Sequence, residues 1–187
     1  MVKKKTCVFI SGNGSNLKNL IYSSRNNNFP ISIKLVICNN KKAKGIIYAK
    51  KNSIPFLILN TKMRNFERIA LKELKKYKIE LICLAGFMRI ISKEFINKFK
   101  RKIINIHPSL LPKYKGLNTF ERILKDKEKK TGCTVHFVNE NLDGGRVILQ
   151  KSFLIKKSDN ILSLKQKTQN LEYKAFPEAI VKIFRYN

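Results

Sequence analysis

The chain has 187 residues, of which 40 are Lys or Arg and 12 are Asp or Glu, so its formal net charge is +28. This length suits one domain with a sizeable core, and the 43% hydrophobic content excludes a disordered basic tail. No apolar run approaches the roughly 20 residues of a membrane span or the h-region of a signal peptide. We therefore expect a single cytoplasmic domain over residues 1–187 with no membrane contact.

The positive charge is a candidate signal for nucleic-acid binding, because a pI near 10.2 is an electrostatic footprint of such proteins. Lys supplies 32 of the basic residues and Arg only eight, and they are spread along the whole chain. An excess of Lys, Ile and Asn is typical of an AT-rich genome. We therefore expect no nucleic-acid partner, although the field would attract small anions.

The cysteines lie far apart in apolar stretches, and none forms a Cys-x-x-Cys pair. Only two histidines accompany them. This usage predicts no metal site and favours buried, reduced thiols. The residues concerned are Cys7, Cys38, Cys83 and Cys133.

Apolar runs alternate with amphipathic segments along the first half of the chain, which predicts an α/β domain with a mostly parallel sheet flanked by helices. Thr6–Ile10 reads as a strand, a glycine turn follows, and Leu17, Leu20 and Ile21 recur at helical spacing. The next expected elements are a strand at Ile31–Cys38, a helix around Ala43–Lys51, an extended piece at Pro55–Leu59, an amphipathic helix from Phe66 to Tyr77 and a strand at Leu81–Ala85.

The second half of the chain predicts fewer elements. Their expected boundaries are a strand at Ile103–Ile106, strands at Thr134–Val138 and Val147–Ile155, and a mainly helical segment from Ile161 to about Phe184.

The first motif that could carry chemistry is the glycine turn after the first strand. Glycines allow close approach of a ligand to the backbone, and the N-terminus of the following helix favours phosphate. The alternative is a tight turn in which Ser15 or Asn16 only caps the helix. The candidate phosphate-binding residues are Gly12, Asn13, Gly14, Ser15 and Asn16.

The second motif is Asn105-Ile106-His107-Pro108. Alternate residues of a strand share a face, so Asn105 and His107 would project together at the carboxyl edge of the sheet, where α/β proteins bind ligands. His can transfer a proton near neutral pH, and an Asn amide can donate to an oxyanion. A hydrogen-bonded structural pair remains the alternative.

Two further features are ambiguous by themselves. Asp143 precedes two glycines, which is typical of a turn, but it could also be a carboxylate held near His107. Gln169 and Glu172 share a helix face that by default is solvated. The other histidine, His136, alternates with apolar residues and reads as structural.

Taken together and in this order, the motifs resemble the phosphoribosylglycinamide formyltransferases, a family of folate-dependent formyltransferases. The histidine segment and Asp-Gly-Gly are shared by folate-dependent formyltransferases in general. The glycine turn narrows the resemblance to the phosphoribosylglycinamide formyltransferases. The resemblance covers residues 6 to about 184. It implies a Rossmann-like formyltransferase fold. The segments that carry it are Ile10–Leu17, Leu84–Ile90, Asn105–Tyr114 and Leu142–Gly145.

The resemblance implies that the amine of glycinamide ribonucleotide attacks the formyl carbon of 10-formyltetrahydrofolate, without a metal. The family's catalytic residues match Asn105, His107 and Asp143. Asn105 and protonated His107 would stabilise the oxyanion. Asp143 would raise the pKa of His107, and it would help to take the proton from the amine.

The resemblance also implies binding residues and small-molecule partners, in a monomer or homodimer. Two departures from the family pattern are Asn118, where many members have His, and Arg146, where a small residue or Pro is common. The ribonucleotide would contact Gly12, Asn13, Gly14, Ser15, Asn16, Gln169 and Glu172, and the folate would contact Arg64, Phe87, Met88, Arg89, Ile90, Asn105 and Asp143.

Three rival functions follow from the same features. Methionyl-tRNA formyltransferase and formyltetrahydrofolate hydrolase share the chemistry, but each is expected to carry an additional domain for which 187 residues leave no room. A basic RNA-binding protein would use Arg and exposed aromatic side chains, whereas Arg is scarce and Trp is absent here.

Overall fold

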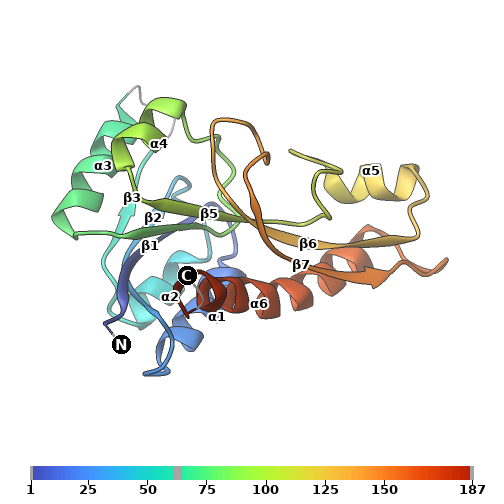
Figure 1. Ribbon diagram of the computed structural model, residues 1–187, viewed down its shortest axis with the longest axis horizontal. Helices are drawn as coiled ribbons and strands as arrows, with labels where there is room; N and C mark the ends of the chain where they lie inside the picture. Colours follow the sequence, from blue (N-terminus) through green and yellow to red (C-terminus); the bar gives the residue numbers. More distant parts are fainter. Residues whose placement is uncertain (1, 61–64, 186–187) are drawn as a thin grey trace. The chain divides into compact units, whose positions relative to one another are not determined.

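The computed structural model describes residues 2–60 and 65–185, which form an α/β fold (Figure 1). The strands follow the order β3-β2-β1-β4-β5-β6-β7, which confirms the expected mostly parallel sheet. The strands are β1 (Lys4–Ile10), β2 (Ile31–Cys38), β3 (Phe56–Ile58), β4 (Leu81–Leu84), β5 (Lys102–His107), β6 (Lys130–Phe137) and β7 (Val147–Leu154). The helices are α1 (Ser15–Ser24), α2 (Ile46–Lys51), α3 (Phe66–Lys76), α4 (Lys93–Phe99), α5 (Thr119–Lys125) and α6 (Ile161–Arg185).

The chain folds as two compact units, Met1–Asn105 and Ile106–Asn187, and the boundary falls within β5. The expected single domain over residues 1–187 therefore stays a prediction.

The first unit is built on parallel pairing of β1 with β2 and β4. All four residues of β4 are buried, as expected for a strand that is covered on both faces. Figure 1 shows α1 and α2 on one face of these strands and α3 and α4 on the other. The fully buried Phe9 of β1 meets the Phe95 ring of α4 edge-on, with 6.3 Å between the ring centroids.

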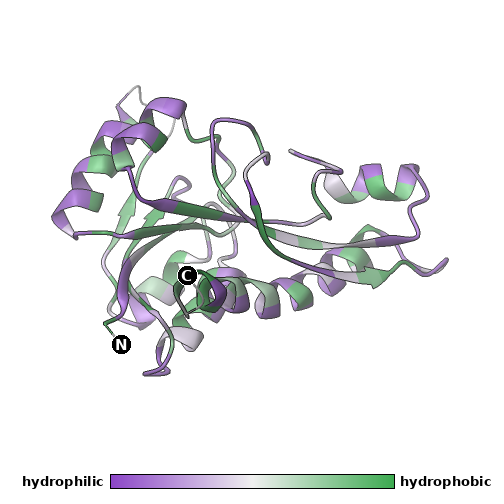
Figure 2. Ribbon diagram, viewed as in Figure 1, coloured by the Kyte–Doolittle hydropathy of each residue, from purple (hydrophilic) through white to green (hydrophobic). Residues whose placement is uncertain are grey.

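The second unit contains an antiparallel pair, β6 and β7, against which α6 packs (Figure 1). Hydrophobic and hydrophilic stripes alternate along α6 in Figure 2, as expected for a helix with one face on a sheet. Near the start of α6, Leu164 forms a buried cluster with Phe120 and Ile123 of α5. This cluster ties α5 to α6.

Most expected boundaries agree with the structure within a few residues, and β2 agrees throughout. Two helices of seven residues each, α4 and α5, were not expected, although the still shorter α2 was. Strand β6 begins at Lys130 instead of Thr134, because antiparallel pairing with β7 extends it. Within the described part of the chain, no helix is long and apolar enough to cross a membrane.

Candidate active site

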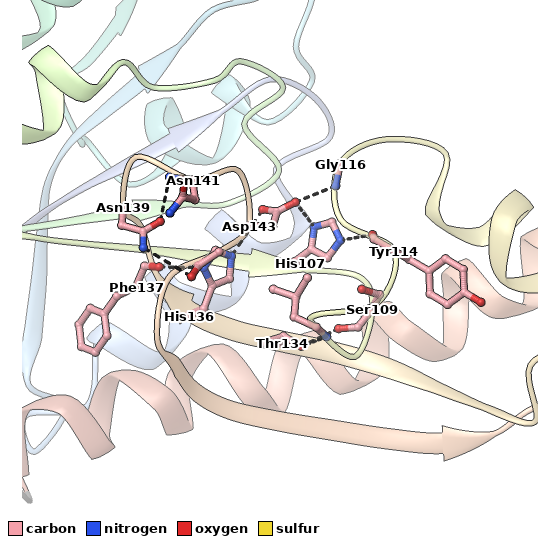
Figure 3. Close-up of polar contacts among 12 residues, drawn as sticks. His107, Ser109, Tyr114, Gly116, Thr134, His136, Phe137, Asn139, Asn141 and Asp143 are labelled. Carbon is pink, nitrogen blue, oxygen red and sulfur yellow. Dashed lines mark hydrogen bonds and ion pairs between the residues drawn. The ribbon is translucent and has the colours of Figure 1, made fainter.

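His107 and Asp143 form a buried pair in the second unit (Figure 3). His107 ends β5 with only 5% of its surface exposed, and its Nδ1 lies 3.3 Å from Asp143 Oδ2. Its Nε2 lies 2.8 Å from the carbonyl oxygen of Tyr114. Both ring nitrogens therefore face acceptors, so an imidazolium would find a partner for each of its N–H groups.

Asp143 has partners on both of its carboxylate oxygens. Oδ2 also accepts the Gly116 N–H at 2.8 Å, and Oδ1 lies 3.6 Å from Nε2 of His136. Burial would raise the pKa of this carboxyl group, but the hydrogen bonds from His136 and Gly116 and the charge of His107 outweigh it. The net effect lowers the pKa of Asp143, so the group is a carboxylate at neutral pH.

Asp143 raises the pKa of His107, as expected, but the net shift of this pKa is downward. Burial lowers this pKa, and the Asp143 charge and the Tyr114 carbonyl offset only part of the shift. Coulombic interactions with His136 and Arg122 lower it further. His107 is therefore predominantly neutral at neutral pH in the ligand-free protein, and ready to accept a proton.

His136 is a site residue that sequence reasoning missed. It is 2% exposed, and its Nδ1 lies 2.8 Å from the carbonyl oxygen of Phe137. The alternation of His136 with apolar residues correctly indicated burial, but its contact with Asp143 links two segments that the sequence alone does not bring together. Asp143 is thus held between two histidines.

The tight turn after β6 explains why glycines follow Asp143. Asp143 itself has a left-handed backbone with a φ of 45°. A Cβ atom on Gly145 would lie 1.8 Å from the carbonyl oxygen of Phe137, so no other residue fits without moving the backbone. The Gly144 N–H donates to the Asn141 carbonyl at 3.0 Å and closes the turn. The sequence therefore fixes the direction in which Asp143 projects.

In the first unit, the N-cap residue of α1 differs from the expected Ser15 or Asn16. Gly14, with a φ of 69°, occupies the N-cap of α1, so Ser15 and Asn16 lie in the first turn and not at the cap. A Cβ atom on Gly14 would come within 2.6 Å of the Gly45 Cα, and the Gly45 N–H donates to the Gly12 carbonyl at 3.0 Å. The segment before α2 thus packs directly against the loop, a contact that sequence reasoning missed.

Ser11 connects three loops at the carboxyl edge of the strands in the first unit. Its hydroxyl accepts the Met88 N–H at 2.7 Å, and its carbonyl accepts the Asn40 side-chain amide at 3.1 Å. These bonds join the segments that follow β1, β2 and β4. The sequence feature that could have indicated this role is the position of Ser11, a polar residue directly after an apolar strand.

The expected folate-binding residues after β4 divide into two kinds. Phe87 is half-buried and meets Phe9 edge-on with 5.2 Å between the ring centroids, so it belongs partly to the core. Met88 and Ile90 are 69% and 68% exposed, and Arg89 is also exposed. Apolar side chains left this open to solvent are available to a ligand. Arg64 lies outside the described residues.

The remaining candidate site residues lie on β5 and α6. Asn105 lies on β5 two residues before His107, and it is half-buried. Gln169 and Glu172 are half-buried on α6, and the Glu172 charge contributes to the raised pKa of Cys133. Glu172 therefore lies near enough to Cys133 of β6 to act on it electrostatically, and it is not fully exposed.

The two departures from the family pattern have structural roles. Asn118 is the N-cap residue of α5 and has a left-handed backbone with a φ of 53°, which Asn tolerates better than most residues. The Arg146 guanidinium lies over the Phe137 ring, 4.9 Å from its centroid. Neither residue displaces His107 or Asp143.

The cysteines are buried free thiols, as expected. Burial raises the pKa of Cys7 and of Cys83, and burial together with the Glu172 charge raises that of Cys133 to about 12. Thiols with such pKa values are poor nucleophiles at neutral pH. Among residues 2–60 and 65–185, no group of three or more His, Cys, Asp or Glu side chains could hold a metal ion.

Comparison with known proteins relates this geometry to a family. A family model described as formyl transferase matches residues 4–180. The trifunctional purine biosynthetic protein adenosine-3 of Homo sapiens is 41% identical over 182 residues, which cover 95% of this chain but only 18% of that protein. The phosphoribosylglycinamide formyltransferase of Haemophilus influenzae is 39% identical over 183 residues, covering 95% of this chain and 85% of the relative.

A solved structure extends the likeness to three dimensions. The phosphoribosylglycinamide formyltransferase of Campylobacter jejuni superposes with a TM-score of 0.91 at 36% sequence identity. The match covers 98% of each chain.

Proposed function

Because this chain belongs to the phosphoribosylglycinamide formyltransferase family, we propose that it transfers the formyl group of 10-formyltetrahydrofolate to the amine of glycinamide ribonucleotide, in purine biosynthesis. The observation that carries the proposal is the buried pair of His107 and Asp143, 3.3 Å apart, on the motifs that define the resemblance. A buried carboxylate beside a neutral histidine is suited to moving a proton.

Binding is assigned to residues in each unit. In the first unit, the phosphate of the ribonucleotide would bind the Gly12–Asn16 loop, where the backbone approaches closely and α1 begins. The exposed Met88 and Ile90 would cover the apolar part of the folate. In the second unit, Gln169 and Glu172 would contact the ribonucleotide. No metal is required, because the formyl group of the donor is already an activated acyl group.

The reaction would begin when the lone pair of the amine attacks the formyl carbon. The carbonyl electron pair moves onto oxygen, and the Asn105 amide donates to the resulting oxyanion. Asp143 accepts the proton released by the attacking nitrogen, directly or through one water, and shares it with His107. The carbon–nitrogen bond to the folate then breaks, and the departing folate nitrogen receives that proton.

The contacts of His107 favour charge that develops only during the reaction. In the neutral ring one nitrogen faces an acceptor without a proton, whereas the imidazolium donates to both the Asp143 carboxylate and the Tyr114 carbonyl. Proton uptake therefore completes the hydrogen bonds, and the new positive charge stabilises the oxyanion. Hydrogen bonds that are stronger in the transition state than in the ground state raise kcat.

The test is formyl transfer by the purified protein with each of two acceptors. Turnover with glycinamide ribonucleotide and 10-formyltetrahydrofolate, with none on methionyl-tRNA, is the expected result. Turnover on methionyl-tRNA with none on the ribonucleotide would contradict the proposal. Salt-resistant RNA binding without any formyl transfer would instead favour the nucleic-acid reading of the +28 charge.

A further inference from the structure

One loop supplies a backbone partner to both members of the buried pair. The Tyr114 carbonyl lies 2.8 Å from His107 Nε2, and the Gly116 N–H donates to Asp143 Oδ2 at 2.8 Å. Only Lys115 separates these two backbone groups. Figure 3 shows the loop passing beside the pair so that both contacts come from its inner side. A shift of this loop would therefore displace both side chains together.

The loop has an unfavourable backbone conformation at these positions. Tyr114 has a φ of 59° and Gly116 a φ of 76°. Glycine adopts this region freely, but a bulky residue such as Tyr does so only with backbone strain. The Tyr114 conformation therefore needs support from contacts elsewhere.

The Tyr114 side chain supplies that support by anchoring the loop to the segment after α5. Its hydroxyl lies 2.9 Å from Asp126 Oδ2 and 3.0 Å from Glu128 Oε1, so either carboxylate can accept its proton. Its ring packs against the cluster formed by Phe120, Ile123 and Leu164. Burial and these two carboxylates raise the pKa of Tyr114, so the hydroxyl remains a donor.

Arg122 of α5 contacts both the Tyr114 ring and the backbone of the same loop. Its guanidinium lies 5.3 Å from the ring centroid, and its Nη1 donates to the Lys115 carbonyl at 2.7 Å. Arg122 thus binds the Lys115 carbonyl, which lies between the backbone groups of Tyr114 and Gly116 that contact the buried pair. These contacts are at the surface, where such interactions add little to global stability.

We propose that Tyr114 is a positioning residue for the His107–Asp143 pair, acting through its own carbonyl and the Gly116 N–H and anchored by its hydroxyl on Asp126 and Glu128. This inference rests on the proposed formyl transfer for its kinetic consequence. Its structural consequence is the orientation and protonation of the His107 ring, which can be measured without any substrate.

The direct test is Tyr114→Phe, which removes only the hydroxyl. The expected result is a kcat about tenfold lower with little change in KM for either substrate, because small misplacement of catalytic groups lowers the rate of the chemical step. The ¹⁵N resonances of the His107 ring should shift in the same variant. Tyr22→Phe is the matched control, since Tyr22 is 74% exposed in the first unit, and it should change neither quantity.

A second comparison separates the anchor from a general loss of structure. Glu128→Gln keeps an acceptor for the Tyr114 hydroxyl and should resemble the wild type. Replacing Asp126 and Glu128 together by Ala removes both acceptors and also the ion pair of Glu128 with Lys113, so it should lower kcat at least as much as Tyr114→Phe. Adding Tyr114→Phe to that double variant should have no further effect, because the same hydrogen bonds are already lost.

Two outcomes would overturn the inference. One is a Tyr114→Phe variant with wild-type kcat and unchanged His107 resonances. The other is an additive effect of Tyr114→Phe on the double variant. If the wild-type protein transfers no formyl group, the proposed function fails. The His107 resonances would still decide the positioning role by themselves.

Discussion

Asp143→Asn is the substitution that tests the proposed chemistry most selectively. Asn has nearly the shape of Asp, and its amide oxygen can still accept the Gly116 N–H. What disappears is the negative charge 3.3 Å from His107 Nδ1 and the group that would take the proton from the amine. The fold should be retained while proton transfer is impaired.

The size of the effect follows from that distance. At an effective dielectric constant of about 20, unit charges 3.3 Å apart attract each other by about 5 kcal/mol. The amide oxygen of Asn recovers a small part of this attraction. A loss of about 4 kcal/mol from the transition state corresponds to a kcat lower by about 10³-fold.

The assay is the initial rate of formyl transfer at neutral pH, with thermal unfolding measured in parallel. Glu178→Gln is the control for removing one negative charge, because Glu178 pairs with Lys151 at the surface and lies 53% exposed. It should retain wild-type activity. A folded Asp143→Asn variant within tenfold of the wild-type kcat would refute the role given to the carboxylate.

Three further predictions concern the glycine loop and the histidine beside Asp143. Gly14→Ala should lower the free energy of unfolding by about 1–3 kcal/mol in denaturant titrations, because φ is 69° and the new Cβ would meet Gly45. Gly12→Ala has open space and should lower it much less. Ser15→Ala should weaken ribonucleotide binding more than folate binding, and equal losses in calorimetry would contradict the phosphate assignment. His136→Leu removes a hydrogen bond that lowers the pKa of Asp143, so the kcat/KM profile should lose activity at a higher pH on acidification than in the wild type.

The pH dependence of stability should have a defined sign. The pKa of Asp143 is lower in the folded protein than its ordinary value. The carboxylate therefore contributes stability above the unfolded pKa of about 3.9, and this contribution is lost as the pH falls through the folded pKa. Denaturant titrations from pH 7 downward should show a smaller acid loss in Asp143→Asn than in the wild type. An equal loss would contradict the pairing.

The parallel core could be predicted because its signal is local. Strand β4 is a continuous apolar run and β2 ends in one over Leu35–Cys38, and a buried parallel strand has this pattern. Helices α4 and α5 could not be predicted in the same way, because they are short and are stabilised by packing and by a cap such as Ser92. Their existence depends on tertiary contacts.

The site was only partly predictable, because part of it also depends on tertiary contacts. Asn105 and His107 belong to one strand, so alternation alone placed them on one face. The distance from His107 to Asp143 depends on the turn after β6, where Gly145 allows a close approach that no local pattern reveals. The contacts of His136 and Tyr114 likewise join segments that are separate in the sequence.

The most direct test of the central claim follows an isotopically labelled formyl group from 10-formyltetrahydrofolate in a single turnover of the wild-type protein. We predict that the label appears on the amine of glycinamide ribonucleotide and that the same transfer is nearly abolished in Asp143→Asn. Release of the label as formate, with none on the ribonucleotide, would show hydrolysis of the folate and would contradict the account.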